Sequence, residues 1–266
     1  MSFSAAWLTL REPYDARARN SAVMDAVAAA FDRRSSVSVT DLACGTGSTL
    51  RALTPRLGGR QSWRLCDNDL SLLARAPQSA LPNLNVTTMP VDLNRDLEAA
   101  LDGPVDLVTT SALLDLVSES WLQRFAVEAA ARRLPVYAAL SYDGRIEMTP
   151  AEHGDVAMVA AVNAHQRTDK GFGPALGPLA AAAAVERLER VGYSVVQGLS
   201  DWAFAPDDRD IQLEVLSGWA AAARDLGTVP VDDVIDWLKR RHAHVAAGRS
   251  SIRVGHVDFF AAPAAR

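Results

Sequence analysis

The first 145 residues alternate between segments with the pattern of a buried β-strand and segments with the pattern of a helix. Runs rich in β-branched and aliphatic residues end near positions 42, 67, 89, 110 and 142, and helix-like runs with apolar residues three and four apart separate most of them. Parallel neighbouring strands need a crossover connection, which is usually a helix. The alternation therefore favours an α/β fold with a parallel, doubly wound sheet.

Residues 39–50, VTDLACGTGSTL, connect the first predicted strand to a helix through a glycine turn. Gly45 and Gly47 allow a ligand to approach the backbone closely and present N–H groups at the start of a helix. Asp41 precedes the turn, where it can accept hydrogen bonds from a ligand ammonium group or from loop amides. The alternative is that the turn is only a tight connection.

Asp67 ends the second predicted strand, 20 residues after Gly47. An acid at that distance can accept hydrogen bonds from both hydroxyls of a ribose, so the pair of features favours a nucleoside-bearing cofactor. A helix N-cap is the alternative role for Asp67. A nicotinamide or flavin dinucleotide fits poorly, because Leu50 stands where the third glycine of that motif is required, and no Gly-Lys-Ser/Thr follows to form a P-loop.

The turn resembles the acid-x-Gly-x-Gly-x-Gly motif of class I S-adenosylmethionine-dependent methyltransferases, with Ala43 in place of the first glycine. The resemblance implies S-adenosyl-L-methionine as the cofactor, with its methionine portion at the turn, its ribose at Asp67 and its adenine amine beside Asp92. The stretch HQRTDKGFGPALGP is also similar to one found in bacterial methyltransferases, and it implies no substrate. The cofactor contacts implied by the resemblance are Asp41, Ala43, Cys44, Gly45, Gly47, Asp67, Asn68, Asp92, Leu93, Ser111 and Arg19.

The same resemblance implies a Rossmann-like sheet of seven strands in the order 3-2-1-4-5-7-6, with strand 7 antiparallel. Residues 1–266 then form a single domain in which residues 1–34 are lid helices over the cofactor. Residues 144–179, rich in glycine and proline, and residues 207–248, with the pattern of two helices, are expected to be substrate-side insertions.

Four polar residues are candidates for catalysis. Asp115 follows the fourth strand, where such folds face the transferring methyl group, and Tyr142 ends the fifth strand. Histidine is a residue type suited to proton transfer, which makes His165 a candidate, and Arg167 can pair with a substrate carboxylate or phosphate. The alternatives are a cap or salt-bridge partner for Asp115, a turn at Tyr142 and a solvated helix end for the other two. Arg11, in the N-terminal segment, can bind a carboxylate, but the favoured alternative for an isolated arginine is a surface charge.

Composition limits the partners and the location. The net charge is −5, and no basic stretch is interleaved with aromatic residues, which argues against a nucleic-acid partner. Two cysteines give no sign of a disulfide framework or a metal site. Without 18 consecutive apolar residues or the features of a signal peptide, we expect no membrane partner and a cytoplasmic location for a monomer or homodimer.

The function predicted from these observations is methyl transfer to a small molecule, with anionic acceptors included. Two alternatives remain open at this point. One is a non-catalytic module or inactive partner subunit that binds S-adenosylmethionine, because a fold does not establish an activity. The other is a protein or nucleic-acid methyltransferase.

Overall fold

The computed structural model describes residues 3–76 and 83–264, and its centre is an eight-stranded sheet. The strand order is β3-β2-β1-β4-β5-β8-β6, and the short β7 pairs with β8. Strands β1 to β5 pair in parallel, whereas β8 is antiparallel to β5 and β6. The predicted fold class and order are thus confirmed, with β8 as the predicted seventh strand. The bounds are β1 Ser36–Leu42, β2 Arg60–Asp67, β3 Leu84–Pro90, β4 Leu107–Ser111, β5 Val136–Thr149, β6 Tyr193–Leu199, β7 Trp202–Phe204 and β8 Ser251–Pro263.

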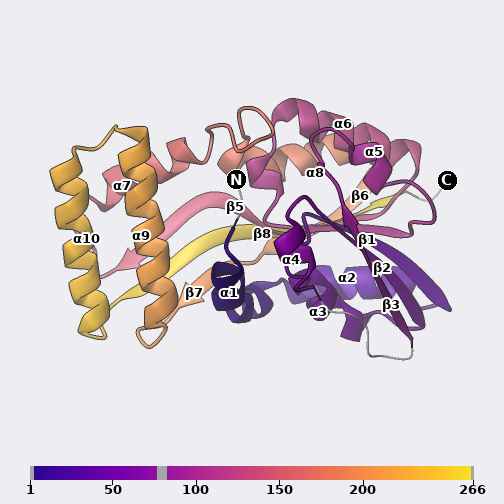
Figure 1. The fold of residues 1–266 in the computed structure, drawn as a ribbon, viewed down its shortest axis with the longest axis horizontal. Helices are drawn as coiled ribbons and strands as arrows, with labels where there is room; N and C mark the ends of the chain where they lie inside the picture. The colour runs from indigo at the N-terminus through magenta and orange to yellow at the C-terminus, as the bar shows by residue number, and fades with distance from the viewer. Residues whose placement is uncertain (1–2, 77–82, 265–266) are drawn as a thin grey trace.

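Helices cover both faces of the sheet (Figure 1). One layer contains α5 (Leu97–Ala100), α6 (Glu119–Ala131) and α8 (Ala180–Arg190), and the other contains α2 (Ser21–Phe31), α3 (Ser48–Leu53) and α4 (Leu70–Leu73). Short 3-10 turns are η1 Thr54–Arg56, η2 Leu114–Leu116 and η3 Gly177–Leu179. Each layer packs on its own buried apolar cluster, as a doubly wound sheet requires.

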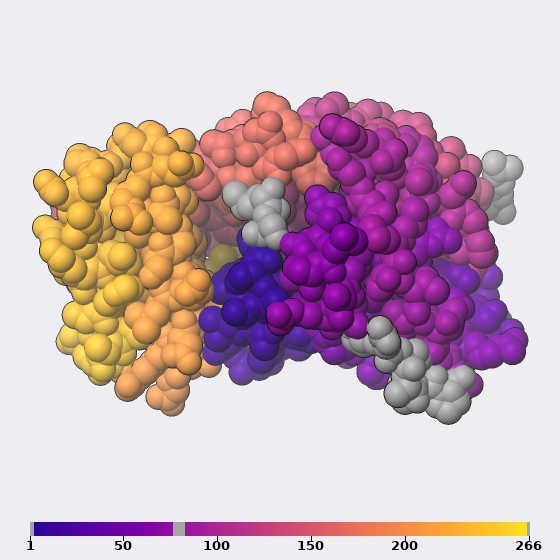
Figure 2. Space-filling view, viewed as in Figure 1, coloured from indigo at the N-terminus to yellow at the C-terminus, as the bar shows by residue number. Residues whose placement is uncertain are grey.

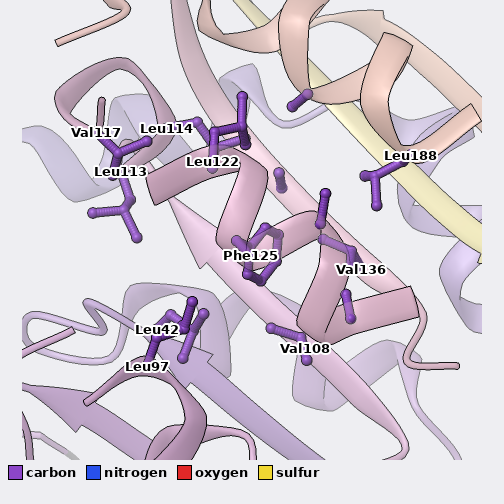
Figure 3. Packing of buried hydrophobic residues seen from close by; sticks show 14 of the residues in the cluster. Leu42, Leu97, Val108, Leu113, Leu114, Val117, Leu122, Phe125, Val136 and Leu188 are labelled. Atoms are coloured by element: carbon purple, nitrogen blue, oxygen red, sulfur yellow. The ribbon is translucent and has the colours of Figure 1, made fainter. Parts of the chain in front are cut away.

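Helix α6 shows how sequence pattern becomes packing. Ser118 caps its first turn by accepting a hydrogen bond from the Trp121 amide at 3.3 Å. Figure 3 shows Phe125 of this helix near Val108 of β4 and Val136 of β5, and Leu122 near Leu114 of η2. The apolar side chains at helical spacing are buried, so the amphipathic pattern is what fixes α6 to the sheet: Trp121, Leu122, Phe125, Ala126 and Ala129.

A third buried cluster lies beyond the end of the parallel sheet, where β5 and β8 continue as a pair (Figure 1). On this extension pack α7 (Asp155–His165), α9 (Arg209–Leu226) and α10 (Val231–Ala246). The two helices expected within residues 207–248 are therefore present. Strand β5 runs to Thr149, so the first residues of the segment 144–179 are strand rather than loop.

The N-terminal segment forms two helices, α1 (Ala5–Ala18) and α2, which meet at Asn20. Asn20 caps α2 by accepting a hydrogen bond from the Val23 amide at 3.1 Å. Helix α2 buries Val23 and Val27 in the sheet core, whereas α1 packs beside β7 and the glycine turn. Only α1 thus occupies the place expected of a lid. Among the helices described here, none combines the length and apolarity needed to cross a bilayer.

Candidate functional site

The glycine turn between β1 and α3 is held in left-handed backbone conformations. Gly45 and Gly47 have φ of 55° and 84°, and Ala43 has φ of 53°. The Cys44 amide donates to the Cys66 carbonyl at 3.0 Å and the Gly47 amide to the Cys44 carbonyl at 2.8 Å. Alanine therefore occupies a conformation that favours glycine, at the position where the methyltransferase motif has one.

The carboxylate of Asp67 is bound to this turn. Its Oδ2 accepts a hydrogen bond from the Gly45 amide at 2.8 Å, and its Oδ1 accepts one from the Asp69 amide at 2.9 Å. The N-cap of α4 is Asp69, which accepts hydrogen bonds from the amides of Ser71 and Leu72. The alternative role of Asp67 as a helix N-cap is therefore wrong, because its carboxylate joins the end of β2 to the turn.

A cavity of about 240 Å³, here called the turn cavity, lies above the glycine turn. The predicted cofactor residues that line it are Ala43, Cys44, Gly45, Asp67, Asn68, Asp92, Leu93 and Ser111. Further lining comes from polar and apolar residues that sequence reasoning did not select, namely Asp15, Thr46, Ser48, Thr49, Asp69, Leu72, Val91, Leu113 and Phe172.

Negative charge predominates in the turn cavity. Four carboxylates line it, those of Asp15, Asp67, Asp69 and Asp92, against the cations of Arg11 and Lys170. Arg11 is already paired with Asp15, at 2.9 Å between Nε and Oδ2. Such a lining disfavours a diphosphate and favours a ligand that carries hydroxyls and a positive charge.

Asp41, Gly47 and Arg19 do not line the cavity, in contrast to the prediction. Arg19 lies behind it, where its guanidinium donates to the hydroxyls of Thr49 and Ser111 at 3.3 and 3.5 Å. Gly47 begins α3. These three residues support the residues that line the turn cavity and do not line it themselves.

Asp41 is fully buried, and only one of its two carboxylate oxygens has a hydrogen-bond partner among the described residues. Its Oδ1 accepts a hydrogen bond from the Thr109 hydroxyl at 2.7 Å, whereas Oδ2 has no hydrogen-bond partner among the described residues. Burial raises the pKa of Asp41 to about 7, against the opposing effects of Thr109 and Arg19. The chain thus keeps a carboxylate with an unused acceptor directly before the turn.

A second cavity of about 420 Å³ adjoins the turn cavity. Figure 2 shows a hollow between α1 in indigo, α9 in orange and the salmon segment that includes α7. Aromatic side chains form much of the lining, so we call it the aromatic cavity: Phe3, Trp7, Tyr142, Trp202 and Trp219. Both cavities are lined by Phe3, Arg11, Ala112, Leu116 and Lys170, which form a shared wall.

Three of the four predicted catalytic residues line the aromatic cavity, namely Asp115, Tyr142 and His165. Arg167 does not, because its side chain is exposed and it lines neither cavity. The stretch NAHQRTDKGFGP instead contributes Lys170, which is 5% exposed and part of the shared wall.

Asp115 is buried, and its Oδ1 has no hydrogen-bond partner among the described residues. Burial raises the pKa of Asp115 to about 6. No ion pair within residues 3–76 and 83–264 includes Asp115, and the first turn of η2 begins after Leu113. The structural alternatives for Asp115, a cap or a salt-bridge partner, are therefore not supported.

Tyr142 and His165 have partners already. The Tyr142 hydroxyl donates to Asn163 Oδ1 at 2.7 Å, and burial raises the pKa of Tyr142 above its usual value. His165 Nε2 lies 3.2 Å from Asp225 Oδ2, and its Nδ1 lies 3.3 Å from Lys170 Nζ. Burial lowers the pKa of Lys170, whose ammonium also donates to the Thr168 hydroxyl at 2.9 Å.

Sequence reasoning missed His256 and favoured a surface charge over carboxylate binding for Arg11. Arg11 is 8% exposed, and its guanidinium lies 4.9 Å from the ring centroid of Trp202, so its interpretation as a surface charge is wrong. Its spacing of four from Asp15 was a local signal of a helical ion pair. The burial, however, comes from Trp202, whose Nε1 donates to Asp15 at 2.9 Å. His256 is 5% exposed within β8 and lines the aromatic cavity.

Residues 39–135 match the family model of a methyltransferase domain. This chain contains a class I methyltransferase domain. The match confirms the predicted family and, with it, S-adenosylmethionine as the cofactor that the family uses. The matched segment runs from β1 to the start of β5 and contains the glycine turn and Asp67.

Solved structures are similar to this chain over most of its length. A cyclopropane-fatty-acyl-phospholipid synthase-like protein from Lactobacillus casei superposes with a TM-score of 0.53 at 14% identity, over 94% of this chain and 98% of that one. A methyltransferase from Thiobacillus denitrificans in complex with S-adenosyl-L-homocysteine gives 0.45 at 15% identity, over 98% and 100% of the two chains. A cyclopropane synthase from Mycobacterium tuberculosis gives 0.49 at 11% identity, over 91% and 83%. The search of the curated proteins gave no match.

Proposed function

We propose that this methyltransferase domain binds S-adenosylmethionine in the turn cavity and transfers its methyl group to a small molecule in the aromatic cavity. The observation that carries the proposal is the shared wall, because it brings the contents of the two cavities together at Arg11, Ala112, Leu116 and Lys170. Methyl transfer is an in-line displacement whose main requirement is that donor and acceptor are held in line and away from water.

The lining of the turn cavity fits this cofactor. The cofactor supplies an activated methyl group on a positively charged sulfonium, and four carboxylates line the cavity. Asp67 is placed to accept the ribose hydroxyls, because it lies beside the turn and lines the cavity. Asp92 and Leu93 border the same cavity, where they would flank the adenine. Asp41, with its unused oxygen, adds negative charge behind the turn.

The volume of about 420 Å³ and the aromatic lining of this cavity support a small acceptor rather than a protein or a nucleic acid. Lys170 offers a positive charge to an anionic acceptor, since the groups it is bonded to, Thr168 and His165, are not carboxylates. Asp115 is the candidate to take a proton from the acceptor, and Tyr142 and His165 shape the wall. Arg167 is left out of this assignment because it is exposed.

Isothermal titration calorimetry of the full chain tests the cofactor, with S-adenosylmethionine, S-adenosylhomocysteine and NAD⁺ as ligands. We expect the first two to bind and NAD⁺ not to bind, because Leu50 and the acidic lining both disfavour a dinucleotide. Tight binding of NAD⁺ without binding of S-adenosylmethionine would contradict the proposed cofactor. Cofactor binding without turnover on any acceptor would favour the non-catalytic module.

A further inference from the structure

Two side chains that line the aromatic cavity each carry a proton-accepting atom without a hydrogen-bond partner among the described residues. One is Oδ1 of Asp115, on a side chain that is 6% exposed. The other is Nε2 of His256, because the hydrogen bond that this ring makes within the described residues is formed by Nδ1, at 3.1 Å from the Val254 carbonyl. Both residues line the cavity, so a ligand is the natural partner for each atom.

The contact between His256 and Val254 fixes the imidazole tautomer. A carbonyl oxygen can only accept, so Nδ1 carries the proton and Nε2 carries a lone pair. Burial, together with the nearby guanidinium of Arg11, lowers the pKa of His256 to about 3. His256 therefore accepts a hydrogen bond from a ligand but does not keep the proton.

Asp115 and His256 both lie near Tyr142. His256 is the register partner of Tyr142 across β5 and β8, and their ring centroids are 6.1 Å apart. Asp115 is close enough to the Tyr142 backbone amide for that amide to lower its pKa, although burial dominates. The Tyr142 hydroxyl is occupied by Asn163, so it offers no competing donor here.

The walls around these acceptors are flat and apolar. Trp202 lies 4.9 Å from the His256 ring and 6.2 Å from Trp7, measured between ring centroids. Phe3 and Trp219 add further aromatic surface to the lining. Indole and phenyl walls favour a ligand that is itself a flat ring, because such a ligand buries a large apolar area and pairs with the rings around it.

We propose that the methyl acceptor is a small phenol, bound between the aromatic walls with its hydroxyl directed at Asp115 and His256. This inference rests on the proposed function and names the acceptor class for the same site. His256 Nε2 orients the hydroxyl through a hydrogen bond, and the ionised carboxylate of Asp115 is the general base. Asp115 suits this role because its free oxygen has no other proton to accept.

The reaction balances without a further reactant. The phenol O–H bond breaks and its proton passes to the Asp115 carboxylate, while an oxygen electron pair forms the new bond to the methyl carbon. The bond between methyl and sulfur breaks with its electrons left on sulfur, so the sulfonium becomes the neutral thioether of S-adenosylhomocysteine. The positive charge of the sulfonium and the negative charge of the carboxylate disappear together, and the Asp115 proton returns to solvent after product release.

Binding is tested first on the wild-type chain saturated with S-adenosylhomocysteine. The probes are phenol, catechol and 4-hydroxybenzoate, with benzoate as the partner of 4-hydroxybenzoate that lacks the hydroxyl and ethanolamine as an aliphatic acceptor. We expect at least one phenol to quench the tryptophan fluorescence of the cavity walls and 4-hydroxybenzoate to bind at least about tenfold more tightly than benzoate. With S-adenosylmethionine, the phenol that binds should yield its methyl ether.

Two variants separate the two roles. Asp115→Asn should lower kcat at least about 100-fold with unchanged cofactor affinity, since it removes the proton acceptor. His256→Phe, which keeps a ring beside Trp202, should raise the KM for the phenol several-fold with a smaller change in kcat. Asp102→Asn and His153→Gln are matched controls, because both side chains are exposed and line neither cavity.

The outcomes distinguish this inference from the function on which it rests. If calorimetry shows cofactor binding but no phenol is bound or methylated, the phenol assignment is overturned and the proposed methyl transfer stands. If the wild-type chain does not bind the cofactor, the proposed function itself fails. Undiminished kcat in a folded Asp115→Asn variant would remove Asp115 as the base, and an unchanged KM in His256→Phe would remove His256 as the orienting contact.

Discussion

The turn cavity and the aromatic cavity adjoin, yet the chain builds them in different ways. Much of the turn cavity comes from the ends of β1, β2, β3 and β4, which follow one another within the first 111 residues. The aromatic cavity combines α1, η2, β5, α7, α9 and β8, which are far apart in the sequence. Local sequence motifs can predict a ligand site that is formed by the ends of successive strands of one sheet. They cannot predict a site that is formed by packing distant elements, because no local pattern contains those contacts.

The contrast between the cavities disappears at α1, whose Arg11 faces both of them. The largest effect is therefore expected from Arg11→Met, which leaves Asp15 as a buried charge without its partner. We expect the free energy of unfolding to fall by about 3 kcal/mol or more. Adding Asp15→Asn should restore over half of this loss, because asparagine still accepts the hydrogen bond from Trp202. Urea denaturation measures both, and a double variant as unstable as Arg11→Met would show that the ion pair is not the cause.

The turn cavity should respond on its own to Asp67→Ala. Loss of a hydrogen-bonded carboxylate is expected to weaken cofactor binding by about 1.5–3 kcal/mol, which is roughly 10-fold to 150-fold in Kd. The melting temperature should also fall, because the amides of Gly45 and Asp69 lose their acceptor. Calorimetry gives the Kd, and the KM of the acceptor at saturating cofactor should not change. A shift in that KM with an unchanged cofactor Kd would assign Asp67 to the other cavity.

Asp41→Asn is expected to stabilise the protein without its cofactor. The folded-state pKa of Asp41 is raised from its ordinary value to about 7, so the folded chain holds a proton that the unfolded chain releases. Stability is then lost as the pH rises from about 4 to 7, and asparagine avoids that loss. We expect a gain of about 4 kcal/mol at pH 8 and little at pH 4. Cofactor affinity should fall, because negative charge behind the turn is removed. A gain that does not vary with pH would contradict this origin.

The smallest effect is expected from Arg167→Ala. The side chain is exposed and borders neither cavity, so kcat, KM and cofactor Kd should each change less than about twofold. Lys170→Met, three residues later, is the matched comparison, because Lys170 belongs to the shared wall. An equal loss from both variants would mean that the whole stretch acts as a unit rather than through the residue that faces the cavities.

The fold and the turn cavity were largely predictable from the sequence. The strand order followed from the alternation and the family resemblance, and the glycine turn and Asp67 were recognisable by spacing. Direct ligand contact by Asp41 was not a sound expectation, because spacing shows that an acid precedes the turn but not that its carboxylate points toward Thr109.

The aromatic cavity was predictable only in part. Asp115 could be selected from the sequence because it is an acid among leucines. Its burial could not be predicted, because it depends on how η2 packs. His256 has no local signal, because it is one inward-facing position of a buried strand and becomes polar lining only through its register with Tyr142. Arg167 and Lys170 look alike in the sequence. Of these two residues, only Lys170 lies on the cavity side.

The wall that both cavities share has a thermodynamic consequence. Arg11 and Lys170 are fixed charges within reach of either ligand, so occupation of one cavity alters the electrostatic potential felt in the other. The resulting coupling free energy belongs to the pair of ligands and not to either one, and it is reciprocal. The factor by which S-adenosylhomocysteine changes the affinity for the acceptor must equal the factor by which the acceptor changes the affinity for S-adenosylhomocysteine. Replacing a charge in this wall alters both factors equally, and through them the ease with which the two products leave.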